Sequence, residues 1–148
     1  MKIVYKNPDD SVSLVTPAPI EHLMKVLGND LTQEQYMDHV WERSVPENAV
    51  YPQWIEEEYL PDQYFLAAWR FIDSDNIEVD MDKAREVHMD NIRAVRNEKL
   101  QGLDIETLKG NDVQAQKQDL RDLPKTFDLT AASTPEELKK LWPDGLVP

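Results

Sequence analysis

Three aspartates in the run DSDNIEVD, residues 73–80, alternate with other polar side chains in a way that first suggests a calcium loop. A calcium-binding EF-hand loop needs a glycine at its sixth position and a bidentate glutamate at its twelfth. Counted from Asp73, these positions hold Glu78 and Ala84, so the run lacks both the turn residue and the bidentate ligand. A tight turn that leads into a helix N-cap at Asp80 explains the run better.

Residue types that carry out catalysis are present, but their spacing does not favour catalysis. His22, His39 and His88 lack the four-residue spacing of a metal-binding helix. The four glycines are too scattered for a phosphate-binding loop, and no serine stands in a nucleophile elbow. The carboxylates of Glu56, Glu57 and Glu58 would need a cleft that raises one pKa, and the pattern indicates an exposed run instead. The sequence therefore predicts a protein that is not an enzyme and holds no metal or cofactor.

Acidic side chains dominate the first half of the chain. Residues 1–79 contain 5 Lys or Arg against 15 Asp or Glu, while residues 80–148 contain 11 against 14. The resulting net charges of −10 and −3 repel phosphate backbones, so direct nucleic-acid binding is not expected. A solvated acidic surface that aids solubility is the favoured interpretation, and a surface that mimics DNA in a basic cleft is the alternative.

No segment of the sequence indicates a membrane span or a secretion signal. No stretch approaches the roughly 20 apolar residues that cross a bilayer. The opening residues MKIVYKNPDD turn polar too early for a signal peptide. The absence of Cys excludes disulfide bonds and favours an intracellular site of synthesis. We therefore expect a soluble protein without a membrane partner.

A hairpin and two helices are predicted for the first part of the chain. The β-rich runs KIVY and SVSLV flank a turn at KNPDD. Residues 20–27 place apolar side chains on one helical face, and Gly28 is a suitable stop. Thr32 and Gln35 form a capping-box pattern for a second helix, which Pro46 ends.

The segment between residues 46 and 80 is harder to assign. Pro52 favours an edge strand or an irregular extended segment, and YFLAAWRFI suits a buried strand or a short helix. A strand near Trp69–Ile72, a turn at DSDN and a strand at IEVD together predict a second hairpin. This hairpin could join the first one in a single antiparallel sheet.

Helices are predicted for most of the second half. Asp80 caps a long helix whose apolar residues follow three- and four-residue steps, and which Gly102 and Gly110 weaken towards its end. A further helix in NDVQAQKQDLRDLP is cut off by Pro124, and Thr134 caps a last one in TPEELKKLW. The predicted fold class is α+β, with an acidic α+β portion at 1–79 and a helical portion at 80–148 in one continuous folded unit. Of the four tryptophans we expect about one to be exposed enough to matter for binding.

Several strings in this sequence resemble small proteins of tailed bacteriophages and prophages. They are YLPDQYFLAAWRF, NIEVDMDKAREVHMDNIRAVRNEKLQGLD, QKQDLRDLP and TPEELKKLWP, in this order. The start of the chain, with a strand at Met1–Tyr5 and a break at Pro17–Pro19, is typical of the same group. Gln118–Pro124, which follows an Arg-rich helix at Arg93–Asp104, resembles a motif of phage tail assembly chaperones. The acidic N-terminal half is a departure from the shorter chaperones.

The resemblance implies a non-enzymatic phage protein that acts through protein contacts in tail or tail-fibre assembly. Its partner would be a tail or tail-fibre protein, met in the host cytoplasm, and retention in the virion tail stays open. The hypothetical contact surface contains three arginines and two leucines: Arg93, Arg96, Leu120, Arg121 and Leu123. Salt bridges on a helix surface over a packed leucine stripe are the alternative interpretation. An acidic inhibitor or DNA mimic that binds a host enzyme is the alternative function, and no heptad run specifies an oligomeric state.

Overall fold

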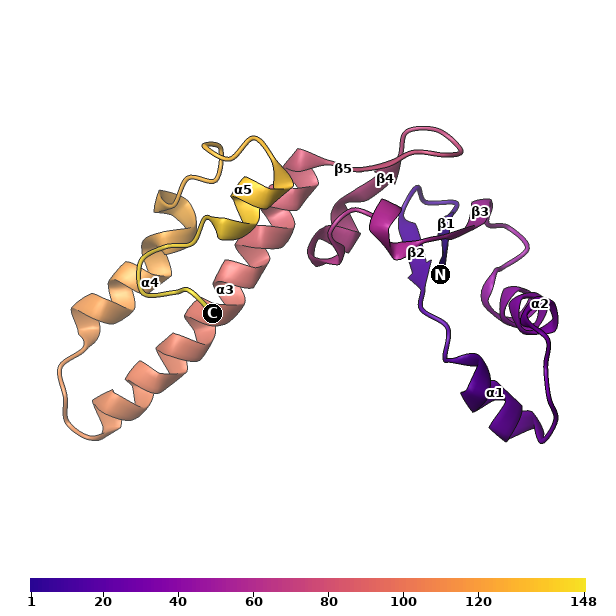
Figure 1. Ribbon diagram of the computed structural model, residues 1–148. Coiled ribbons are helices and arrows are strands. Elements are labelled where there is room, and N and C mark those ends of the chain that lie inside the picture. The colour runs from indigo at the N-terminus through magenta and orange to yellow at the C-terminus, as the bar shows by residue number, and fades with distance from the viewer. The chain divides into compact units, whose positions relative to one another are not determined.

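The computed structural model describes all 148 residues and divides into two compact units, 1–78 and 79–148 (Figure 1). This boundary lies one residue before the predicted division between the acidic portion 1–79 and the helical portion 80–148. The α+β class is confirmed, because strands and short helices make up the first unit and helices most of the second.

A hairpin at the start of the chain forms the centre of the first unit. β1 (Lys2–Lys6) and β2 (Val12–Val15) pair antiparallel with Ile3 opposite Val15, as the sequence predicts. Ile3 and Val4 are fully buried, because β1 lies between two other strands of its sheet. The side chains of β1 therefore supply the core of this unit.

The other edge of β1 is covered by β3 (Val50–Ile55), which gives the strand order β2-β1-β3. Trp54 of β3 stands opposite Ile3, and the register is irregular between Val4 and Lys6. Pro52 fits here because an edge strand leaves one side of its backbone unpaired. Of the two alternatives for this segment, the edge strand is correct.

The second predicted hairpin forms, but the prediction that it could join the first hairpin in a single sheet is wrong. β4 (Trp69–Phe71) and β5 (Ile77–Val79) pair only with each other, in a separate two-stranded sheet. β2 and β3 occupy both edges of β1, and neither β4 nor β5 adds to their outer edges, because strand pairing depends on distant partners that the local pattern does not specify. Asp73 forms the turn by accepting hydrogen bonds from backbone N–H groups of Asp75 and Asn76.

The segment YFLAAWRFI, residues 64–72, combines both predicted possibilities, a short helix followed by a strand. Two 3₁₀ helices, η1 (Glu57–Tyr59) and η2 (Gln63–Ala68), precede the strand, and Phe65 of η2 is fully buried. Trp69 is 2% exposed, and the other three tryptophans are half-buried. Large aromatic surfaces are covered even in a domain this small because their burial is strongly favourable.

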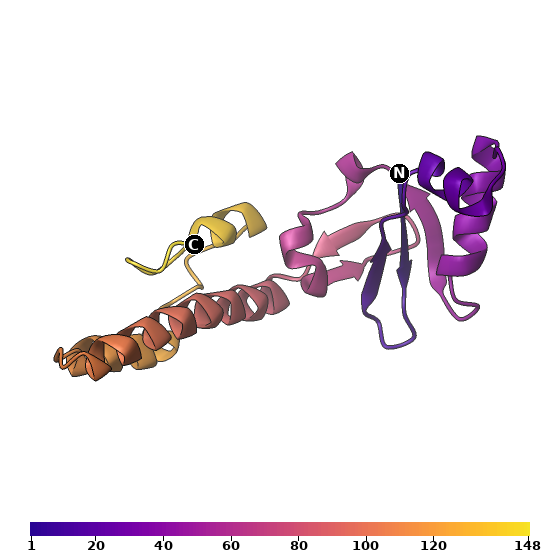
Figure 2. The same cartoon turned by 90° about the horizontal axis from the view of Figure 1, so that it is seen from below.

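α1 (Ile20–Leu27) and α2 (Gln33–Ser44) lie next to one another beside the three-stranded sheet (Figure 2). Gly28 ends α1 with a φ of 74°, a conformation that costs glycine nothing. The capping box of α2 is complete, since Thr32 and Gln35 each accept the other's backbone N–H.

The second unit is organised around α3 (Met81–Leu108), a helix that begins at the Asp80 N-cap as predicted. Its buried residues Ala84, His88 and Ile92 follow a four-residue step along one face. The helix runs through Gly102 and ends before Gly110, whose φ is 89°.

α4 (Gln114–Thr126) packs against α3 and runs back along it (Figure 1). The prediction that Pro124 cuts this helix off is wrong, because the helix continues two residues further. Proline lacks only one N–H, and the last turn keeps the bond from Phe127 N–H to the Leu123 carbonyl at 2.9 Å. The Thr126 hydroxyl adds a contact to the Asp122 carbonyl.

α5 (Pro135–Lys140) begins at Thr134, whose hydroxyl accepts the Glu137 N–H at 3.2 Å, as predicted. Leu138 of α5 and Leu146 of the final segment are buried against the rest of the second unit. No helix of the chain combines the length and the apolar character that crossing a bilayer requires.

Candidate protein-binding surface

The three arginines of the hypothetical contact surface lie on the outside of the second unit. Arg93 of α3 is exposed and donates to Asp90 at 2.7 Å, one helical turn away. Arg96 is half-buried and donates to the side chain of Asn97 at 2.9 Å. Arg121 of α4 is exposed and forms no ion pair within the chain. Exposed pairs such as Arg93–Asp90 contribute little stability, so these guanidinium groups can exchange to another carboxylate at small cost.

The two leucines of the same set are less accessible. Leu120 is only 8% exposed and belongs to the buried residues of α4, while Leu123 is half-buried. They therefore support the packing of the second unit more than they offer a surface. Of the five residues, Arg93 and Arg121 are the ones that are exposed to a partner.

The structure places Arg93 in a hollow of about 460 Å³ that the sequence does not indicate. One wall is α3 and the other is the segment that follows α4. The lining residues are Arg85, Glu86, Met89, Asp90, Arg93, Phe127 and Leu129. Met89 and Arg85 have a sequence signal, because they stand one and two turns before Arg93 on α3. Phe127 and Leu129 have none, since they lie outside any regular element.

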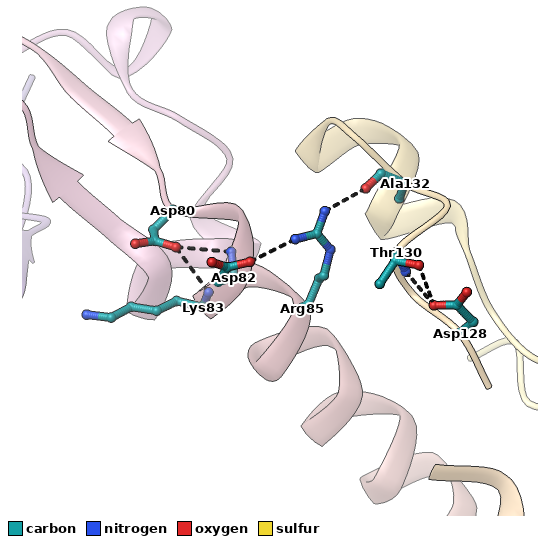
Figure 3. A network of polar contacts seen from close by, with 7 residues as sticks. All are labelled: Asp80, Asp82, Lys83, Arg85, Asp128, Thr130 and Ala132. Atoms are coloured by element: carbon teal, nitrogen blue, oxygen red, sulfur yellow. Dashed lines mark hydrogen bonds and ion pairs between the residues drawn. The ribbon is translucent and has the colours of Figure 1, made fainter. Parts of the chain in front are cut away.

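Arg85 holds the two walls together (Figure 3). Its guanidinium donates to the Asp82 carboxylate at 3.0 Å and to the Ala132 carbonyl at 3.1 Å. The latter contact links the first turns of α3 to a residue 47 positions later. The Nε atom of Arg85 is buried and has no hydrogen-bond partner within the chain.

Asp128 stabilises the opposite wall. Its carboxylate accepts hydrogen bonds from the hydroxyl of Thr130 at 2.7 Å and from the backbone N–H of the same residue at 2.8 Å (Figure 3). These bonds, with the nearby positive charge of Arg85, hold the pKa of Asp128 below its ordinary value. The ionised carboxylate keeps both of these hydrogen bonds. They fix the turn from Asp128 to Thr130, which positions Phe127 and Leu129 in the wall.

The hollow combines apolar surface with both signs of charge. Met89, Phe127 and Leu129 offer apolar contacts, Arg85 and Arg93 offer guanidinium groups, and Glu86 and Asp90 offer carboxylates. That mixture is typical of a protein-binding surface, where arginine and aromatic residues are enriched. We take this hollow, together with Arg96 of α3 and Arg121 of α4, as the candidate protein-binding surface.

In the first unit, folding brings together two histidines that spacing alone does not pair. His22 of α1 and His39 of α2 both line a hollow of about 340 Å³, and Arg43 lies on the same hollow. The Nε2 atom of His39 is buried without a hydrogen-bond partner. The structure contains no group of three or more His, Asp or Glu side chains arranged to hold a metal ion, so no metal centre is assigned.

Comparison of the chain with models of protein families, with characterised proteins and with solved structures finds no match. The likeness to phage assembly proteins therefore rests on the short strings of the sequence alone.

Proposed function

We propose that this chain is a non-enzymatic bacteriophage protein that acts through protein–protein contacts in the assembly of a tail or tail fibre. The observation that carries the proposal is the hollow between α3 and the segment after α4, with Arg93 among its lining residues. It lies within the part of the chain that resembles phage proteins, and its chemistry suits a protein partner.

A second feature of the same unit supports a protein partner. Ile105 and Leu108, in the last turn of α3, are 55% and 88% exposed. Single exposed apolar residues are common, but two of them one turn apart form an exposed apolar patch at the end of α3. A partner protein that covers this end would remove both side chains from water.

An assembly protein of this kind would act by covering a surface on an immature tail protein until the proper neighbour arrives. Unpaired strand edges and apolar patches are the surfaces that aggregate when left uncovered. The apolar residues of the hollow, Met89, Phe127 and Leu129, would contact such a patch. Arg93 would exchange Asp90 for a carboxylate of the partner.

Quantitative mass spectrometry after cross-linking tests this function, applied to purified particles and to infected-cell lysate. Cross-links to tail or fibre proteins are expected in the lysate. A fixed copy number in particles would make the chain a structural component of the tail, and absence from particles would make it a chaperone. Cross-links to host enzymes alone would overturn the role in tail assembly.

The contact surface is tested separately, with the variant Arg93→Ala, Arg96→Ala, Arg121→Ala. Its cross-links to the tail protein are expected to fall by about tenfold, because each lost exposed charge pair weakens binding by a small factor. The control Lys109→Ala, Lys125→Ala, Lys140→Ala removes the same charge from exposed positions of this unit that do not line the hollow. Undiminished capture by the arginine variant would show that the partner binds elsewhere.

A host-enzyme inhibitor remains the second candidate, and the acidic first unit favours it. The 15 acidic residues against 5 basic ones would attract a basic cleft over long range. Cross-linking to a basic nuclease or polymerase, with no tail protein captured, would support this candidate against the first.

A further inference from the structure

α2 and β3 of the first unit border a second kind of hollow, of about 630 Å³. Its apolar residues are Met37 and Trp41 of α2 and Trp54 of β3. Met37 and Trp41 are one turn apart, so helix geometry puts both on the side of α2 that borders the hollow. The two tryptophans are 13 positions apart in the chain and belong to different elements, and only the fold brings them to one surface.

The hollow continues past Trp54. A neighbouring hollow of about 260 Å³ is also lined by Gln33, Met37 and Trp54, and extends along Pro17, Pro19 and Ile20. The two hollows therefore form one groove with a largely apolar floor. We call it the tryptophan groove.

The indole N–H groups of this groove are free, in contrast to those elsewhere in the chain. Trp69 donates to the Asp62 carbonyl at 3.2 Å, and Trp142 donates to the Lys139 carbonyl at 2.9 Å. Trp41 and Trp54 donate no hydrogen bond within the chain, and neither N–H is buried. Because solvent reaches both N–H groups and no group of the chain accepts from them, they can donate to a carbonyl of a bound chain.

Uncommitted carboxylates lie beside the apolar floor. Glu34 and Asp38 of α2 line the groove four residues apart, and neither takes part in an ion pair or side-chain hydrogen bond. The scarce cations of the unit are mostly used elsewhere: Lys2, Lys6 and Arg70 pair with Glu57, Asp10 and Glu78. No Lys or Arg lines the groove, so Glu34 and Asp38 have no side-chain cation beside them in its lining.

We propose that the tryptophan groove binds a segment of a separate protein in which apolar side chains stand next to Lys or Arg. The apolar side chains cover Met37, Trp41 and Trp54, backbone carbonyls accept from the two indoles, and the cation meets Glu34 and Asp38. Cations also bind favourably to tryptophan faces, which reinforces the same choice of partner. The carboxylates repel phosphate, so a nucleic acid or an anionic membrane is the wrong occupant. This inference does not depend on the role in tail assembly.

Titration of the full chain with short end-blocked peptides tests the proposal at physiological ionic strength. The probe contains Leu and Lys, and the two control peptides contain Ser with Lys and Leu with Glu. The Leu and Lys peptide is expected to bind at least about tenfold more tightly than either control, since both apolar contact and charge are needed. Equal binding of the Ser and Lys peptide would overturn the proposal, because the groove would then add nothing to general charge attraction.

The position of binding is read from the four indole N–H signals in a nitrogen-15 NMR spectrum. The signals of Trp41 and Trp54 are expected to move when the Leu and Lys peptide binds. The signals of Trp69 and Trp142 are expected to stay, because backbone carbonyls already hold their N–H groups. Movement of only the latter two would place the peptide elsewhere and overturn the assignment.

Matched charge variants complete the test. Glu34→Gln with Asp38→Asn is expected to weaken the Leu and Lys peptide by about tenfold, as two exposed charge pairs are lost. Glu42→Gln with Glu47→Gln changes the net charge equally at exposed positions outside the groove and should leave affinity nearly unchanged. Equal weakening by both pairs would contradict a local site. A dimer of the chain that Glu34→Gln with Asp38→Asn dissociates would instead make a second copy the occupant.

Discussion

The Nε2 atom of His88 lies 2.7 Å from the carbonyl oxygen of Leu141, a residue 53 positions later in the chain. Because a carbonyl oxygen can only accept, the neutral imidazole carries its proton on Nε2. The ring also meets the indole of Trp142 edge-on, with the ring centroids 4.9 Å apart. His88 is fully buried, so this contact attaches the segment after α5 to the first third of α3.

Burial gives His88 a pH-dependent effect on stability. Loss of solvent lowers its pKa below the ordinary value of 6.5, and the bond to Leu141 only partly offsets this. The unfolded chain therefore binds a proton more readily than the folded one. The stabilising contribution is complete above pH 6.5 and is lost as the pH falls below that value.

We expect the free energy of unfolding, measured by urea denaturation, to fall as the pH is lowered from 6.5 towards 5, the window below the ordinary pKa of histidine. His88→Gln, which does not titrate, should show a smaller fall over the same range. His22→Gln, at an exposed position, is the control and should follow the wild type. Identical slopes for the wild type and His88→Gln would contradict the assignment.

The buried ammonium of Lys117 is a second point of stability. Lys117 is 6% exposed, and its Nζ lies 2.7 Å from the carboxylate of Asp104, across the α3–α4 pair. We expect Asp104→Ala to lower the free energy of unfolding by about 1–3 kcal/mol, because it leaves the ammonium without its partner. Lys117→Met removes the charge together with its need for a partner and should lie within about 1 kcal/mol of the wild type.

The exposed pair Lys109–Glu106 serves as the comparison, measured by the same urea denaturation. Lys109→Met should change the free energy of unfolding by less than about 1 kcal/mol, as is usual for surface pairs. If Asp104→Ala proves as mild as Lys109→Met, then Lys117 finds solvent or another acceptor on its own.

The start of α3 depends on one carboxylate. Asp80 accepts the backbone N–H of Asp82 at 3.0 Å and that of Lys83 at 3.2 Å. Asp80→Ala should lower the free energy of unfolding by about 1 kcal/mol, whereas Asp80→Asn, which keeps the acceptor, should cost less. Thermal unfolding followed by circular dichroism measures both, and equal losses would mean that charge matters here more than capping.

Two glycines with open space around them should respond in opposite directions to alanine. Gly102 lies inside α3, and an added methyl group meets nothing within 4 Å, so Gly102→Ala should stabilise by about 0.5–1 kcal/mol. Gly28 has equal space but a φ of 74°, so Gly28→Ala should destabilise by about 1 kcal/mol. Both are measured by urea denaturation, and changes of the same sign would show that backbone conformation does not govern these positions.

Local signals in the sequence determine where most elements begin and end. The caps at Thr32, Asp80 and Thr134 and the stop at Gly28 each act through hydrogen bonds or backbone conformation within a few residues. Such interactions are fully contained in a short window, which is why the hairpins, most helix starts and the α+β class are predictable. Pro124 is the exception, because one missing N–H near a helix end leaves the neighbouring bonds to continue the turn.

Tertiary structure alone decides which of these elements meet. Nothing in the local pattern says that β3, and not the second hairpin, takes the free edge of β1, because strand pairing depends on distant partners. The same holds for the surfaces proposed to bind partners. Arg93 and Phe127 line one hollow, and Trp41 and Trp54 line another, only after packing has brought separate elements together. Residue types and charges are thus encoded locally, whereas the sites that they form are long-range consequences of burying a common core.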